Sequence, residues 1–281
     1  MLRLISQGKK HIFDRPVLMG ILNVTPDSFS DGGRYNQMDD AIRHCETLLS
    51  DGADIIDIGG CSTRPNNAIA TEQEEMERVV PILKAIRKAF PETLISIDTF
   101  RKNVAEACMS EGANIINDIS GGLFDNEMLP YIGKNHIPYV MMHCVGTPET
   151  MHQYTLSGDI HQTVMDFFAQ RCKTLEAYGD QQIILDPGIG FGKSLDANYQ
   201  LLSDLERYRH NNLPVLIGIS RKSLIFKVLG STPQTAENGT TVLNTIALLN
   251  GADIVRVHDV KNAREAIKLV ETYCQSIGKT L

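Results

Sequence analysis

Aspartate, asparagine and basic side chains recur at the ends of short apolar runs along the 281 residues of this chain. A single aspartate in that position is as often a helix N-cap or a turn former as a functional group. The repetition favours a shared ligand site, because the carboxyl ends of parallel strands meet at one face of a sheet or barrel. In chain order these residues are Asn23, Asp57, Asp98, Asn117, Asp118, His143, Asp186, Ser220, Arg221, Lys222, Arg256 and His258.

Three of these side chains suit the edge of a flat heterocycle. Asp98 and Asp186 supply acceptors for amino and ring N–H groups. The carboxamide of Asn117 can donate to a ring nitrogen and accept from an N–H at the same time. The combination predicts a site for a nitrogen heterocycle.

Cations are placed on the last two apolar runs. Arg256 and His258 alternate in the segment RVHDV, which puts both side chains on one face of a strand, and Lys222 follows the preceding run. Many barrel enzymes bind phosphate groups on that side of the fold. The three residues predict an anion subsite, with solvated surface cations as the alternative.

Two connecting segments, residues 24–35 and 61–70, are rich in glycine, proline, serine and threonine. Ordering such segments costs conformational entropy that ligand contacts can offset, so we expect ligand-covering loops in preference to plain surface loops. The segment DPGIGFGK, residues 186–193, lacks the spacing of a phosphate-binding loop, and its glycines are interpreted as allowing close approach of a ring. Histidines in the loops and helices lack metal-ligand spacing, so no zinc site is expected.

The elements that must position these groups alternate along the chain. Eight apolar runs, each followed by a stretch with helical spacing of apolar residues, are typical of a buried parallel sheet. An open doubly wound sheet usually carries a glycine-rich turn after its first strand, where this chain has NVTPDSFSDGG, so an α/β fold with a single (β/α)8 TIM barrel is favoured. The predicted strands are residues 17–23, 54–58, 94–98, 114–118, 138–143, 182–186, 214–220 and 253–258.

Glycines end several of the predicted helices. Gly52, Gly112, Gly179 and Gly251 follow helical stretches directly, and three of them begin a repeated Gly-Ala-(Asp or Asn)-Ile phrase that leads from a helix into a strand. Residues 2–13 predict an N-terminal β-hairpin over the lower mouth of the barrel, and nothing resembles an interdomain linker, so residues 1–281 are expected to form one domain. The predicted helices are residues 39–50, 72–90, 102–111, 159–178, 236–250 and 262–275.

The net charge, the cysteines and the apolar runs indicate which partners and which cellular compartment to expect. A formal net charge of −7 argues against a general affinity for nucleic acid or an anionic membrane surface. Six cysteines without a CxxC pair indicate free thiols in a reducing compartment. The first residues lack a signal-peptide core, and no apolar run approaches the roughly 18 residues of a spanning helix, so a cytoplasmic enzyme is expected.

Seven motifs in order make the sequence resemble the dihydropteroate synthase family of pterin-binding TIM-barrel enzymes over nearly its whole length. One departure is Cys61, where many members of that family carry glutamate before STRP, which makes the behaviour of this loop harder to predict. The motifs are GILNVTPDSFSDGG at residues 20–33, STRP at 62–65, SIDT at 96–99, NDIS at 117–120, LDPGIGFGK at 185–193, SRKS at 220–223 and RVHDV at 256–260.

The resemblance implies a role for each matching position. It implies that pterin pyrophosphate and para-aminobenzoate are the substrates and that Mg²⁺ is the cofactor, with Asn23 beside Mg²⁺ and the pyrophosphate. Asp98, Lys222 and Asp186 would be catalytic. The residues implied to bind the pterin are Asp98, Asn117, Asp186, Lys222, Gly218, Met142 and Phe191; those for the pyrophosphate are Arg64, Arg256 and His258; those for para-aminobenzoate, where sulfonamides would compete, are Thr63, Pro65, Phe29 and Ser223.

The resemblance also implies a dissociative reaction and a homodimer formed through the outer helices. Pyrophosphate would leave the pterin methylene carbon, the resulting cation would be delocalised into the ring and stabilised by Asp98, and the arylamine would then attack. Two alternatives remain at this point. A folate-dependent methyltransferase would also hold a pterin with Asp and Asn, and the departure at Cys61 leaves room for a non-catalytic pterin-binding protein.

Overall fold

The computed structural model describes residues 2–25, 34–62, 68–147, 150, 156 and 158–279. Its main sheet has eight parallel strands in the order β8-β7-β6-β5-β4-β3-β10-β9. A parallel bridge between Leu185 and Val215 joins the two outer strands, and the Leu185 amide donates to the Pro214 carbonyl at 2.8 Å, so the sheet closes into the predicted barrel. The strands are β3 (Val17–Asn23), β4 (Ile55–Gly59), β5 (Leu94–Asp98), β6 (Ile115–Asp118), β7 (Tyr139–Met142), β8 (Ile183–Asp186), β9 (Leu216–Ile217) and β10 (Ile254–Val257).

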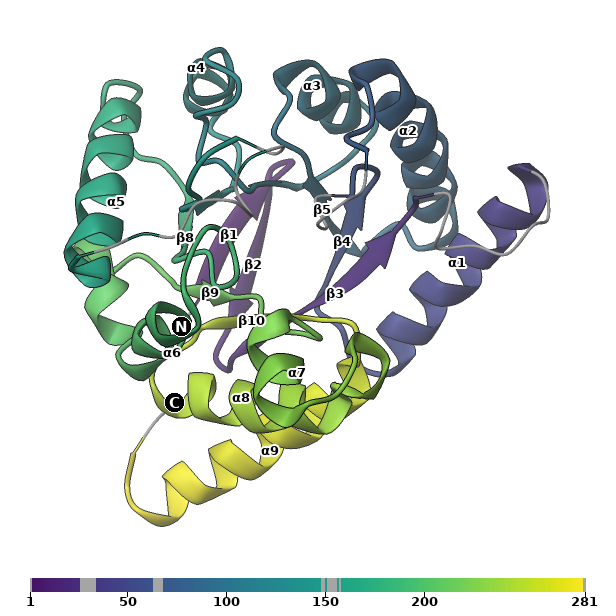
Figure 1. Cartoon of the computed structure of the whole chain (residues 1–281). Coiled ribbons are helices and arrows are strands. Elements are labelled where there is room, and N and C mark those ends of the chain that lie inside the picture. The colour runs from purple at the N-terminus through teal and green to yellow at the C-terminus, as the bar shows by residue number, and fades with distance from the viewer. Residues whose placement is uncertain are drawn as a thin grey trace.

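Helices surround the strands (Figure 1). The six predicted helices are confirmed, and α4, α6 and α7 accompany them. None of the described helices is long and apolar enough to cross a membrane. The helices are α1 (Arg34–Ser50), α2 (Glu72–Ala89), α3 (Lys102–Ser110), α4 (Met128–Asn135), α5 (Ile160–Glu176), α6 (Leu195–Ser203), α7 (Ser223–Leu229), α8 (Glu237–Leu249) and α9 (Val260–Ser276).

The predicted N-terminal hairpin is also present. Strands β1 (Leu2–Ser6) and β2 (Lys9–Phe13) pair antiparallel and lie across the middle of the ring in Figure 1. Leu2 and Leu4 pack against the inner apolar residues of the barrel strands, so the hairpin closes the amino end of the barrel. The inner apolar residues are Val17, Met19, Ile55, Leu94, Ile115, Val140, Ile184, Leu216 and Ile254.

The alternation of side chains along each strand decides which residues reach the barrel interior. Outward positions such as Leu18 and Ile56 belong to the large cluster that packs against the helices. On every barrel strand except β3, the residue two positions beyond the inner apolar residue belongs to a second inward layer, which we call the polar layer. The polar layer consists of Asp57, Ser96, Asn117, Met142, Asp186, Gly218 and Arg256.

The repeated Gly-Ala-(Asp or Asn)-Ile phrase acts as predicted, as a helix exit and strand entry. Gly52, Gly112 and Gly251 have φ values of +101°, +95° and +99°, which glycine adopts without strain. The Asp or Asn that follows the alanine of each phrase accepts a hydrogen bond from a backbone N–H in, or directly before, a neighbouring strand. These acceptors are Asp54 for Leu18, Asn114 for Ile95 and Asp253 for Val215.

Candidate active site

An arginine joins a buried and a partly buried carboxylate across the carboxyl end of the barrel. Arg256 on β10 donates from Nε to Asp57 Oδ2 and from Nη2 to Asp98 Oδ2, both at 2.6 Å. Asn117 Nδ2 donates to the same Asp57 oxygen at 3.0 Å. Four strands, β4, β5, β6 and β10, therefore converge on one hydrogen-bonded cluster, although their residues are distant in the sequence.

In this cluster, burial and the neighbouring opposite charges shift the pKa values of Asp98 and Arg256 in opposite directions. Removal from water raises the pKa of Asp98 to about 7, while Arg256 opposes that rise and Asp57 adds to it. Burial works against a charged Arg256, but Asp57 and Asp98 raise the pKa of its guanidinium. Asp98 can therefore change its charge near neutral pH, whereas Arg256 remains a cation.

A second charged pair lies on the other side of the interior. Asp186 ends β8 and accepts the Gly188 amide at 2.7 Å. Lys222, after β9, donates to the Ile189 carbonyl at 2.5 Å and lies 4.5 Å from the centre of the Phe191 ring. Burial raises the pKa of Asp186 and lowers the pKa of Lys222 to about 8, and in each case the attraction of the partner opposes the effect of burial.

An apolar wall stands beside these charges. Met142 and Cys144 pack with Phe100 and Ile119, and Phe191 joins the same cluster. Gly218 leaves space between two cations, because a Cβ added there would lie 3.8 Å from Lys222 Nζ and 3.9 Å from Arg256 Cβ. Apolar surface next to buried donors and acceptors suits a flat ring with a polar edge.

Three further predicted site residues, His258 and Asn23 for the pyrophosphate and Ser223 for para-aminobenzoate, lie at or just beyond the ends of strands or at the start of α7. His258 Nδ1 and Ser220 Oγ are 2.9 Å apart, and the same hydroxyl accepts the His258 amide, so the imidazole is held in one orientation. Ser223 is the first residue of α7 and follows Lys222 directly. Asn23 ends β3, and its Oδ1 would lie 3.6 Å from a Cβ added at Gly59.

Three other polar residues at strand ends face away from the interior. Asp118 accepts the Tyr139 hydroxyl at 2.7 Å and a backbone N–H from Ser120. His143 packs edge-on against Phe167 of α5, and burial lowers its pKa to about 3. Arg221 forms two hydrogen bonds with Asp259, so these residues support the fold around the site.

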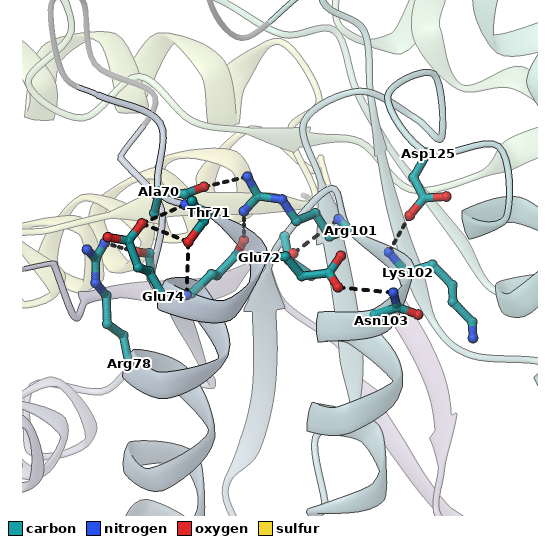
Figure 2. Close-up of polar contacts among 12 residues, drawn as sticks. Ala70, Thr71, Glu72, Glu74, Arg78, Arg101, Lys102, Asn103 and Asp125 are labelled. Atoms are coloured by element: carbon teal, nitrogen blue, oxygen red, sulfur yellow. Dashed lines mark hydrogen bonds and ion pairs between the residues drawn. The ribbon is translucent and has the colours of Figure 1, made fainter.

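The connection from β4 to α2 is anchored at its described ends (Figure 2). Arg78 donates to the Gly60 carbonyl at 3.1 Å, and Arg101 donates to the Ala70 carbonyl and pairs with the buried Glu75 of α2. Thr71 and Glu74 form a capping box at the start of α2. The predicted site residues Thr63, Arg64 and Pro65, like Phe29 in the earlier connection, lie outside the described residues.

No role for Asp57 follows from the sequence alone, although it is one of the polar residues at strand ends. The structure makes it the partner of both Arg256 and Asn117. The available signal was its place in the alternation, since Asp57 stands two residues after the inward Ile55, as Asn117 stands after Ile115.

The side chains at this end of the barrel determine whether a metal ion could bind there. The described residues contain no group of three His, Cys, Asp or Glu side chains that could hold a metal ion. Asn23 offers one amide oxygen at the rim. Mg²⁺ is usually bound through one or two carboxylates together with substrate phosphates and water, so the Asn23 amide would hold it only with the substrate's phosphates as the main ligands.

Comparisons with known proteins agree with this geometry. A family model described as pterin binding enzyme matches residues 19–258. The dihydropteroate synthase of Escherichia coli (strain K12) is 42% identical over 272 residues, covering 96% of each chain, and that of Synechocystis sp. is 43% identical over 260 residues, covering 92% of this chain and 90% of the relative.

Solved structures show the same relationship. The Yersinia pestis dihydropteroate synthase in a sulfonamide complex superposes with a TM-score of 0.89 at 40% identity, covering 98% of this chain and all (100%) of the other. The Burkholderia cenocepacia dihydropteroate synthase complexed with 7,8-dihydropteroate gives a TM-score of 0.87 at 34% identity, with 99% and 98% covered. With the family model, the relatives and the polar layer in agreement, the chain belongs to the dihydropteroate synthase family of pterin-binding enzymes, which are transferases.

Proposed function

We propose that this enzyme condenses 6-hydroxymethyl-7,8-dihydropterin pyrophosphate with para-aminobenzoate to give 7,8-dihydropteroate and pyrophosphate. The observation that carries the proposal is the convergence of Asp98, Asn117, Asp186 and Lys222 on one interior, beside the apolar wall of Met142 and Phe191. A fused, nitrogen-rich ring needs donors and acceptors at its edge and apolar contacts on its faces.

The pterin is assigned to the polar layer. Asp186 and Asn117 accept from its amino and ring N–H groups, and Lys222 donates to its carbonyl oxygen. Gly218 provides room for the ring between Lys222 and Arg256, while Met142 and Phe191 cover its faces. Asp98 faces the pterin from β5, opposite Asp186 on β8.

The pyrophosphate is assigned to the rim. His258, held by Ser220, and the cation Arg256 face the leaving group, and Arg64 is proposed to join them. Asn23 would provide a protein oxygen to Mg²⁺, and the metal when bound supplies charge neutralisation for the departing pyrophosphate. Para-aminobenzoate is assigned to the surface bordered by Ser223 and by Phe29, Thr63 and Pro65, where sulfonamides would compete.

The charges fit a reaction that separates charge. The bond between the methylene carbon and the pyrophosphate oxygen breaks with its electrons on the oxygen, and the positive charge spreads into the pterin. The carboxylates of Asp98 and Asp186 stabilise that cation, and the cations at the rim stabilise the anion. The arylamine nitrogen then forms the new C–N bond and loses a proton, without a covalent enzyme intermediate.

We also propose the assembly and setting of the enzyme. Residues 1–281 form one domain, and the six free cysteines fit the reducing cytoplasm. The homodimer would form through α7, α8 and α9, which lie together in Figure 1 and expose large apolar side chains. A two-fold dimer would cover this face on both copies, and charged substitutions of Val242 and Leu269 should give a monomer in sedimentation. The exposed side chains are Val228, Leu229, Val242, Ile246, Leu249, Leu269 and Tyr273.

The direct test is turnover. The purified enzyme would be mixed with Mg²⁺, the pterin pyrophosphate and para-aminobenzoate, and pyrophosphate and dihydropteroate would both be measured, with Asp186→Ala as control. We expect both products in equal amounts and their loss in the control. Pterin binding without product would contradict the proposal and favour the non-catalytic alternative. Methyl transfer from methyltetrahydrofolate would favour the methyltransferase, for which no feature described above speaks independently.

A further inference from the structure

A lysine near the end of the loop that connects β8 to α6 donates back to carbonyls of that loop and of the residue after β7. Lys193 Nζ is 2.8 Å from the Gly188 carbonyl oxygen, 3.0 Å from that of Phe191 and 3.2 Å from that of His143. An ammonium has three N–H donors, so these three carbonyls account for all of them. No ion pair found in the described part of the chain includes Lys193, so backbone oxygens alone hold its ammonium.

The loop above this ammonium has a backbone that depends on glycine. Gly188, Gly190 and Gly192 have φ values of +70°, +90° and +66°. A Cβ on Gly188 would lie 1.8 Å from the His143 carbonyl oxygen, which shows how closely the loop rests on the end of β7. At this contact the carbonyls of His143 and Gly188 come together, and Lys193 binds both.

Three groups assigned to the pterin depend on the same loop. Its Gly188 amide donates to Asp186 Oδ1 at 2.7 Å, and its Ile189 carbonyl accepts from Lys222 Nζ at 2.5 Å. The Phe191 ring lies 4.5 Å from Lys222 Nζ. A shift of the loop would therefore displace a carboxylate, an ammonium and a ring together.

The charge of Lys193 also acts on Asp186. Burial raises the pKa of Asp186, and Lys222 and the Gly188 N–H oppose that rise, with Lys193 contributing in the same direction. Burial lowers the pKa of Lys193 to about 7, against the attraction of Asp186. Lys193 thus favours the ionised form of the carboxylate that accepts from the pterin.

We propose that Lys193 is a positioning residue of the pterin subsite, which binds the Gly188–Phe191 loop to the end of β7 and so sets the places of Phe191, Lys222 and Asp186. The inference deepens the proposed function and rests on it, because it assigns the pterin to this side of the barrel. Lys193 itself touches backbone carbonyls and is not a catalytic residue.

The test compares Lys193→Met with a matched change at the other end of the barrel. Methionine keeps much of the side-chain volume but removes the ammonium from the three carbonyls, of which that of Gly188 keeps the Phe191 N–H as a donor at 3.1 Å. Arg87 similarly donates to three backbone carbonyls, of Pro91, Thr93 and Gly112, at 2.7–2.8 Å, but it does so near the amino ends of the strands. Arg87→Met is therefore the control for a general loss of stability.

Calorimetric titration with the pterin pyrophosphate and steady-state kinetics would separate the outcomes. We expect Lys193→Met to raise the Kd for the pterin pyrophosphate by about tenfold or more, equivalent to about 1.4 kcal/mol. At saturating pterin, the KM for para-aminobenzoate should change by less than about twofold. Arg87→Met should lower the Tm without changing either constant.

The remaining outcomes each decide a separate point. Equal pterin affinity of the wild type and Lys193→Met would overturn the role of Lys193, as would equal increases in both constants. No pterin binding by the wild type would instead contradict the proposed function. Should Lys193→Met fail to fold, Lys193→Arg keeps the charge but presents a planar fork to the three carbonyls, and the same selective loss of pterin affinity is expected.

Discussion

The two ends of the barrel differ in how their aspartates are paired. At the amino end, the helix-exit phrases are each completed by an arginine, with Arg264, Arg87 and Arg209 donating to the carbonyls of Gly52, Gly112 and Gly251. The same three arginines bind the Asp or Asn of the phrase. Every carboxylate or amide oxygen of those three side chains accepts a hydrogen bond; they belong to Asp54, Asn114 and Asp253.

At the carboxyl end, several buried side-chain oxygens have no hydrogen-bond partner, whereas at the amino end the buried Nε of Arg87 and Nη1 of Arg264 lack one. Asp57 Oδ1 and Ser96 Oγ are examples in the polar layer. The contrast is clearest between two aspartates. Burial opposes ionisation of Asp54, yet hydrogen bonds from Arg15, the Leu18 N–H and Arg264 hold its pKa below the usual value, whereas the pKa of Asp98 rises to about 7.

The difference separates a structural end from a ligand-binding end. At the amino end, arginines and backbone N–H groups donate to the acidic side chains, and these hydrogen bonds stabilise the fold. Unmet polar groups and shifted pKa values at the carboxyl end are typical of a place where a ligand completes the interactions. A substitution at the amino end should therefore change stability and leave turnover nearly unchanged, whereas a substitution at the carboxyl end should reduce turnover.

The largest effect is expected from Arg256→Met. The change leaves Asp57 and Asp98 without the cation that bridges them. Breaking a buried ion pair on one side costs about 3–5 kcal/mol, so the free energy of unfolding should fall by that amount and turnover should become undetectable. Chemical denaturation at pH 8 measures the loss; unchanged stability would show that the bridge is not formed in solution.

Asp98→Asn should mainly affect chemistry. The amide fits the same place but cannot offset a positive pterin, and loss of one such electrostatic contact typically costs about 10²–10³ in kcat. Rapid measurement of pyrophosphate release would show the decrease directly. A normal release rate with unchanged pterin affinity would remove Asp98 from its assigned role.

The pH dependence of kcat/KM for the pterin pyrophosphate should be bell-shaped. Below about pH 7 Asp98 takes up a proton and no longer carries negative charge, while Lys193 above about pH 7 and Lys222 above about pH 8 lose their positive charges. On the acidic side kcat/KM should fall about tenfold per pH unit, because one proton is taken up there. The pKa values seen in kcat/KM belong to the free enzyme. Initial rates in Asp98→Asn should lack the acidic limb, and its persistence there would mean that another group titrates.

Arg87→Met should have the smallest effect on activity. Its carbonyl partners at the amino end would lose their donor, so the free energy of unfolding is expected to fall by about 1–3 kcal/mol. Turnover measured at a temperature well below the Tm should stay within about twofold of the wild type. A large decrease in kcat would mean that the two ends are not independent.

Much of this arrangement could be predicted from the sequence. The apolar runs predicted all eight strands, and the period-two alternation explains why Asn117 faces the interior while its neighbour Asp118 faces the helices. The glycine phrases predicted the strand entries. Strand β9 is shorter than predicted, since only Leu216–Ile217 pair fully before Gly218 interrupts the apolar run.

The pairings across the barrel could not be predicted in the same way. Arg256 and Asp57 are 199 positions apart and meet because β10 and β4 both pair with β3 in the sheet. The role of Lys193 depends on the path of a glycine loop, whose backbone angles no side-chain pattern specifies. Short helices such as α4 and α7 have too few turns to give a clear period.

The most direct test of the account is calorimetric binding of the pterin pyrophosphate to the wild type, Asp186→Asn and Arg87→Met in parallel. If the carboxyl end is the pterin site and the amino end is structural, Asp186→Asn should lose at least about tenfold in affinity, and Arg87→Met should bind as the wild type does. Wild-type affinity in Asp186→Asn, or an equal loss in both variants, would contradict the division between the two ends.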